Sequence, residues 1–151
     1  MKRTTAAAAF VIVFATLFVL GVAPCAAAQD KQCSNASLNG AFAYTNTGFI
    51  VAPPPLAGPF AGVGTQTFDG KGNTFASATV SQNGNIFHVT ITGTYTVNSD
   101  CTGSMTLLVS PVGVSTHADF VIVRGGAEFR AINTDPGTVI TTVGKKQFPD
   151  D

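Results

Sequence analysis

The sequence contains no tryptophan, and only 11% of its 151 residues are charged. An ordinary globular protein carries about 25% charged residues, and the formal net charge of this chain is zero. This scarcity of charge excludes a charged disordered tail and a protein that binds nucleic acid through a basic surface. The glycine-rich motifs that cradle phosphate are missing, as are the metal-binding spacings H-x-H, H-E-x-x-H and C-x-x-C. We therefore expect no cofactor and no metal site.

The start of the chain has the three parts of a secretory signal peptide. It opens with basic residues, continues with an almost entirely apolar run over residues 6–22, and reaches a small-residue cleavage site at 26–28. A retained membrane anchor is the alternative, since a run of this length is at the lower limit for a spanning helix. Because Pro24 ends the apolar run, we expect a signal helix cleaved after Ala28. The single remaining domain, residues 29–151, would be secreted or periplasmic without an inserted membrane segment.

Cleavage would leave two of the three cysteines. Cys25 would leave with the signal peptide, while Cys33 and Cys101 would remain in a compartment that oxidises thiols. We expect these two residues to form a disulfide, and two unpaired thiols are the alternative.

The rest of the chain alternates apolar and polar residues with a period of two, and no window has helical spacing. Glycine, asparagine, aspartate and proline separate the alternating segments, as β-turns require. The predicted strands are 38–49, 60–68, 74–82, 86–97, 103–109, 116–124, 127–134 and 138–146. Short connections make neighbouring strands antiparallel, and eight of them can close into an up-and-down β-barrel without edges. The sequence thus predicts an all-β fold, with a two-sheet β-sandwich as the alternative.

The residues of two connections predict their conformation. Gly125-Gly126 is a dipeptide typical of a tight two-residue hairpin. The one long connection, residues 50–59, contains three consecutive prolines and is expected to lie as a stiff loop across one end of the fold.

The opening of the mature chain resembles that of small calycin barrels. Cys33-Ser34 precedes Leu38-Asn39-Gly40-Ala41-Phe42, which places a glycine and an aromatic residue early in the first strand, as in lipocalins and avidins. The tryptophan that follows this glycine in lipocalins is missing, and so are the tryptophans on which avidins stack biotin. The resemblance therefore implies a barrel with an internal ligand site but not biotin binding.

Two further resemblances cover more of the chain. Segments that resemble a group of small secreted bacterial proteins are 68–72, 93–97, 100–103 and 134–138. The expected architecture also resembles allene-oxide-cyclase-like barrels, in which an apolar cavity with a few polar groups shapes a cyclisation. No catalytic motif of that family can be matched to residues of this sequence.

Three polar residues fall on faces that the alternation assigns to the interior. Tyr44, Gln66 and Tyr95 could each bring a polar group to an apolar lumen, which is how small-molecule sites are usually built. We therefore predict them as ligand-binding residues. The alternative is that both hydroxyls bond to the backbone at the barrel ends and that Gln66 faces outward.

Glu128 and Arg130 share one side of the seventh strand, opposite Val123 and Val121. If this side faced the lumen, the carboxylate and its arginine would form a buried ion pair and a candidate ligand site. If it faced solvent, Phe129 would lie inside. The sequence cannot decide, because both faces of the strand carry apolar residues.

Two further combinations of residues have the right chemistry for a site but the wrong spacing. Ser115, His117 and Asp119 are the residue types of a hydrolase triad, but alternate residues on a strand lie about 6.6 Å apart, too far for triad contacts. His88 and His117 would be the only histidines for a metal site, and they fall on different, non-adjacent predicted strands.

Three functions remain open at this point. The first is a binding module for a small apolar ligand in the lumen. The second is a structural or surface-interaction protein whose threonine-rich, charge-poor exterior associates with other copies of the chain. The third is a cofactor-free, cyclase-like enzyme that uses Glu128 or a tyrosine as acid or base. We prefer these functions in that order, so we favour a binding protein over an enzyme.

The disulfide can be tested on the exported protein. We predict that mass spectrometry of the mature form shows a Cys33–Cys101 bridge, because both thiols enter an oxidising compartment together. Free thiols at both positions would refute the prediction.

Overall fold

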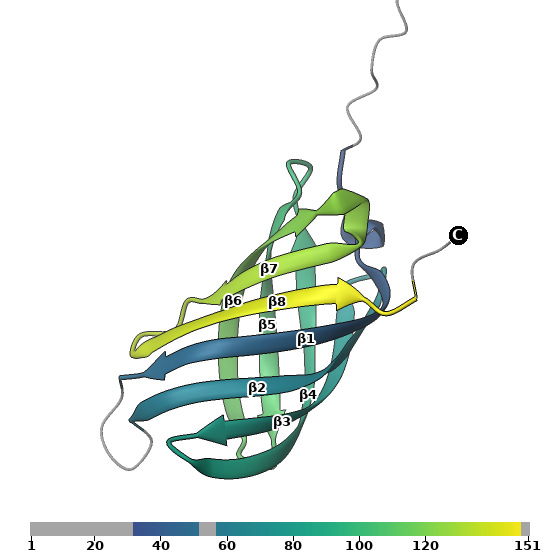
Figure 1. The fold of residues 1–151 in the computed structure, drawn as a ribbon. Helices are drawn as coiled ribbons and strands as arrows, with labels where there is room; N and C mark the ends of the chain where they lie inside the picture. The colour runs from purple at the N-terminus through teal and green to yellow at the C-terminus, as the bar shows by residue number, and fades with distance from the viewer. Residues whose placement is uncertain (1–31, 52–56, 149–151) are drawn as a thin grey trace, which may run out of the picture. The chain divides into compact units, whose positions relative to one another are not determined.

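Eight antiparallel strands surround a common interior in the computed structural model, which describes residues 32–51 and 57–148 (Figure 1). The strands are β1 (Asn39–Ile50), β2 (Gly58–Asp69), β3 (Asn73–Gln82), β4 (Asn85–Val97), β5 (Thr102–Ser110), β6 (Val114–Val123), β7 (Glu128–Asn133) and β8 (Thr138–Lys146). Two 3-10 helices accompany them, η1 (Asn35–Ser37) and η2 (Arg124–Gly126). The predicted signal helix and the three prolines of the long connection lie outside the described residues. Within these residues, no helix has the length and hydropathy needed to cross a membrane.

The strands close into a barrel in sequence order. Each strand pairs with the next, and β1 also pairs with β8, from Phe42 opposite Lys146 to Ile50 opposite Thr138. Each strand therefore has a neighbour on both sides, which removes the two terminal edges that an open sheet would have. The predicted up-and-down barrel is confirmed, and the two-sheet sandwich is wrong.

Closure forces alternate side chains to opposite sides of one continuous wall. In β4, Val89 and Tyr95 are buried at 5% and 3% exposure, while the intervening threonines are exposed. This is the facing that the apolar alternation predicts, since reversing it would expose the large apolar side chains, each worth about 1.5–3 kcal/mol on burial. All eight strands begin and end within two residues of the predicted positions.

The connection between β6 and β7 is longer than expected. Val123 pairs with Glu128, which leaves four residues outside the ladder instead of the predicted two-residue hairpin. Arg124, Gly125 and Gly126 all have positive φ angles. Two glycines in a row favour such a backbone, but here they form the η2 turn rather than a tight hairpin.

One end of the barrel, which we call the closed end, is filled by aromatic rings. Phe42, Phe68, Phe129 and Tyr95 meet edge to face with ring centroids 5.1–5.6 Å apart. Gly144 makes room for this cluster, since a Cβ there would collide with the Phe129 ring. Edge-to-face pairs add about 0.5–1.5 kcal/mol each to the burial of the rings.

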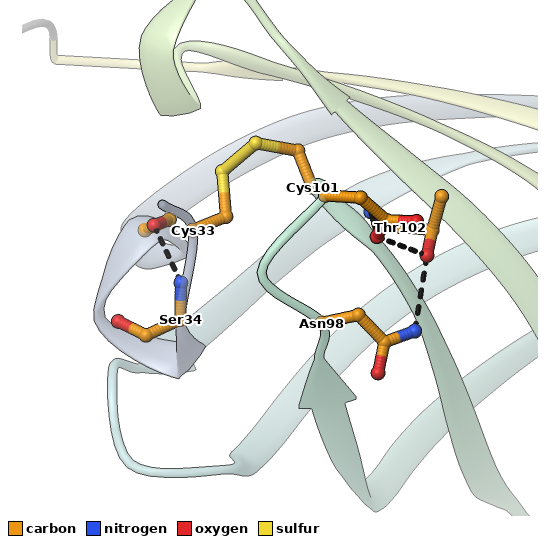
Figure 2. Close-up of a disulfide and its surroundings, with 7 residues drawn as sticks. Cys33, Ser34, Asn98, Cys101 and Thr102 are labelled. Atoms are coloured by element: carbon orange, nitrogen blue, oxygen red, sulfur yellow. Dashed lines mark hydrogen bonds between the residues drawn. A yellow bond between two sulfur atoms is a disulfide. The ribbon is translucent and has the colours of Figure 1, made fainter. Parts of the chain in front are cut away.

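The segment before β1 covers these rings. Leu38 is fully buried, and the side-chain carbonyl of Asn35 accepts a 2.8 Å hydrogen bond from the backbone of Val97. The predicted disulfide is present: Cys33 is bonded to Cys101 in the β4–β5 turn, 68 positions along the chain (Figure 2). A disulfide of this kind indicates a non-reducing environment.

The opposite end, which we call the open end, consists of the connections 83–84, 111–113 and 134–137 together with the adjoining ends of β1 and β2. It lies away from the two short helices in Figure 1. No described segment crosses this end as 33–38 crosses the closed end.

Removing the disulfide should destabilise the barrel measurably. The chain-entropy model assigns about 4 kcal/mol to a loop of this length, and losses of about 2–5 kcal/mol are usual. We predict a loss in this range for Cys33→Ser combined with Cys101→Ser, measured by denaturant unfolding against the oxidised protein. An unchanged unfolding midpoint would show that the bridge is not needed to hold the segment on the rings.

Candidate functional site: the open half of the lumen

Several inward-facing side chains in the half of the barrel nearer the open end are less completely buried than the rings of the closed end. Ile91, Leu107 and Val109 pack against the core from the inner face, yet all three remain half-buried. Polar side chains share this region. We call the whole set the lumen site, and it comprises Tyr44, Asn46, Phe60, Ile91, Leu107, Val109, Thr116, Ala131, Asn133 and Thr142.

Tyr44 is the polar residue of the lumen site that is most deeply buried. Its side chain is 5% exposed, and its hydroxyl has no hydrogen-bond partner within the protein. Burial raises the pKa of Tyr44 to about 12, so the hydroxyl keeps its proton at neutral pH. A buried hydroxyl without a partner costs about 1–3 kcal/mol, which makes it unusual in a native interior.

Asn46 places a second unpaired polar atom on the same face of β1. Its Oδ1 is buried and accepts no hydrogen bond from the protein. Gly62 lies opposite on β2, and a Cβ at this position would collide with Oδ1. Glycine at 62 therefore lets the asparagine side chain lie across the neighbouring strand.

Gln66 and Tyr95 also face inward, but their polar groups are already bonded. Gln66 donates a 3.0 Å hydrogen bond to the Thr74 hydroxyl, and that hydroxyl donates to the backbone carbonyl of Thr67. The Tyr95 hydroxyl donates to the carbonyl of Leu38 at 2.9 Å. The inward facing of Gln66 is as predicted, and Tyr95 makes the backbone bond that we had held as the alternative.

Glu128 and Arg130 lie on the outer face of β7, so the interpretation that places them in the lumen is wrong. Phe129 is buried on the inner side at 1% exposure, as the alternative predicted. Arg130 has a 65% exposed side chain and lines a shallow surface groove of about 560 Å³ across β5, β6 and β7.

Glu128 is nearly covered although it lies on the outside. Arg130 donates a 3.0 Å hydrogen bond to its carboxylate, and Arg124 lies 3.4 Å from the other carboxylate oxygen. The hydrogen bond from Arg130 holds the pKa of Glu128 below its usual value. The carboxylate therefore stays ionised and has no access to the lumen.

The acidic partner of His117 comes from outside the residues considered for a triad. His117 Nδ1 lies 2.7 Å from Asp135, which also accepts a hydrogen bond from the Thr116 hydroxyl. Asp135 lies in the β7–β8 turn, so this cluster ties that turn to β6. The alternation along single strands carried no signal for this contact, because it joins strand β6 to a turn that follows another strand. Within the described residues, no three histidine, cysteine, aspartate or glutamate side chains group as metal ligands.

Comparison of the chain with protein-family models, with curated proteins and with solved structures finds no significant match.

The two inward-facing tyrosines provide a matched test of the unpaired hydroxyl. We predict that Tyr95→Phe lowers the free energy of unfolding by about 1–2 kcal/mol, because it leaves the Leu38 carbonyl without its donor. Tyr44→Phe should leave stability unchanged or raise it by up to about 1 kcal/mol, since it removes a hydroxyl that lacks a partner. Denaturant unfolding of both variants checks this. Equal losses would mean that the Tyr44 hydroxyl has a partner of equal strength.

Proposed function

We propose that the barrel binds a small, largely apolar molecule in the lumen site, which the ligand enters through the open end. The observation that carries this proposal is the contrast between the two halves of the interior. Aromatic rings and the segment 33–38 fill the closed half, while Leu107 and its inward-facing neighbours in the open half remain partly exposed. Small-molecule sites are typically apolar concavities with few polar groups, and β-barrel mouths are a common place for them.

The two unpaired atoms supply the polar part of such a site. The Tyr44 hydroxyl can donate or accept a hydrogen bond, and Asn46 Oδ1 can accept one. A ligand with one polar group on an apolar body would relieve the cost of leaving them unpaired. Among the residues predicted from the sequence, Tyr44 is therefore the one with a free group. Gln66 and Tyr95 would form the wall, and Glu128 and Arg130 would take no part.

An enzymatic role receives less support from the same geometry. The acid that the cyclase-like hypothesis favoured, Glu128, is on the outside and ionised. Tyr44, with its raised pKa, is a poor general base near neutral pH. A binding module needs neither a base nor an acid, so it requires fewer assumptions about this lumen.

The proposal includes export to a secreted or periplasmic location, supported by the disulfide and by the signal-like start of the chain. A lipocalin-like manner of binding fits the barrel topology and the sequence opening.

Neighbouring threonines on β8 give a direct test of lumen binding. Thr142 faces the lumen and Thr141 faces solvent. We predict that Thr142→Phe weakens binding of a neutral naphthylamine dye at least tenfold, because the ring occupies the site. The identical change at Thr141 should leave dye binding unaltered. Fluorescence titration measures both.

Two results would contradict the proposal. If the dye fails to bind the unaltered protein, or if Thr141→Phe and Thr142→Phe weaken binding equally, the lumen is not the site. Thermal unfolding of each variant shows whether it is folded, and only folded variants enter the comparison.

A further inference from the structure

Seven of the fourteen exposed large apolar side chains of the described residues form a set at the open end. They stand on the end of β1, on the β3–β4 and β5–β6 hairpins and on the start of β8, with exposed fractions between 40% and 68%. We call this set the apolar rim, and it comprises Phe49, Val51, Ile86, Phe87, Val112, Val114 and Val139. Single exposed apolar residues need no explanation, whereas a set at one end of a barrel is a candidate interaction surface.

The charged side chains, in contrast, lie mostly away from the open end of the barrel. Within residues 32–51 and 57–148, the charged side chains toward the closed end or midway along a strand are Asp69, Lys71, Asp100, Asp119, Arg124, Glu128, Arg130, Lys145 and Lys146. Asp135 is the exception at the open end, and its carboxylate is held by Thr116 and His117. The apolar rim thus lies where the described chain has no lysine or arginine and one bonded carboxylate.

We propose that the apolar rim docks the open end of the barrel on the surface of a lipid bilayer. A charge-free ring of phenylalanine, isoleucine and valine suits the boundary between headgroups and acyl chains, where apolar side chains are buried and charges are costly. The basic side chains, Arg124, Arg130 and Lys145 among them, would then point away from the bilayer.

The arrangement of the apolar rim favours lipid over a protein partner. Its side chains come from several strand ends and hairpins around an opening rather than from one strand or helix face. Protein interfaces also use charged groups at their margins to fix orientation. The described tips carry no charged side chain beyond the bonded Asp135, and their other polar side chains, such as Asn83 and Asn85, are uncharged. A fluid bilayer requires no matching shape.

Docking in this orientation would place the mouth of the lumen against the source of an apolar ligand. The docking surface itself does not depend on ligand binding, because Phe49 and Val139 face outward from the wall as partners in the β1–β8 ladder. Failure of one proposal therefore leaves the other standing.

Matched double variants test the docking. In Phe49→Ser combined with Val139→Ser, side chains that are 57% and 59% exposed are removed from the apolar rim. The control combines Phe75→Ser with Val63→Ser, which removes side chains that are 52% and 58% exposed and that lie outside the apolar rim. We expect the exported protein to float with neutral phosphatidylcholine vesicles. The rim variant should bind the vesicles at least tenfold more weakly than the unaltered protein, at low and at high salt. The control variant should bind them as the unaltered protein does.

A fluorescent reporter tests the orientation without removing apolar surface. Since the chain has no tryptophan, Phe49→Trp and Phe75→Trp each introduce a single reporter. Vesicles should shift the emission of the first to shorter wavelength and leave that of the second unchanged.

Three results would overturn the proposal. The first is no association of the unaltered protein with neutral vesicles. The second is binding only to anionic vesicles that salt abolishes, since this would assign contact to the basic side chains of the closed end. The third is a dimer in solution that the rim variant dissociates, since this would assign the apolar rim to a second copy of the chain.

Discussion

The pairing of β1 with β8 is the constraint on which the rest of this structure depends. Once the first and last strands share a ladder, every strand has two neighbours, and each residue in the wall must face either the interior or the solvent. A chain with so few charges has little means of protecting a free edge with lysine or glutamate. Closure solves this problem by removing both terminal edges of the sheet, and it creates the lumen at the same time.

The two halves of the barrel interior are lined by different kinds of side chain. At the closed end, Phe42, Phe68 and Phe129 fill the interior, and the Cys33–Cys101 bridge holds the preceding segment over them. The open half has smaller and more polar inward-facing residues, with the unpaired Tyr44 hydroxyl among them. The proposed function assigns stability and binding to different halves: a filled end supports a half whose inward-facing side chains are less completely buried. The proposed function and the proposed docking surface both follow from this asymmetry.

Much of the fold could be predicted from the sequence, because period-two alternation and turn residues are local signals. The facing of β7 could not, since Val121 and Phe120 are apolar on opposite sides of the adjoining strand and either could cover the core. The contact of His117 with Asp135 was equally hidden, because it joins a strand to a turn 18 positions away. Most of all, the alternation indicates that Tyr44 faces inward but carries no information on whether its hydroxyl finds a partner. That depends on the packing of all eight strands together.

Amide hydrogen exchange, followed residue by residue by NMR, tests the closed barrel most directly. In a closed barrel, β1 and β8 are interior strands. The amides of β1 between Phe42 and Ile50 should therefore exchange slowly, whether they point toward β2 or toward β8. Their exchange rates should be similar to those of amides in the β4–β5 ladder. Rapid exchange of every second amide along β1 and β8, with the alternate amides protected, would reveal two free edges and contradict the account.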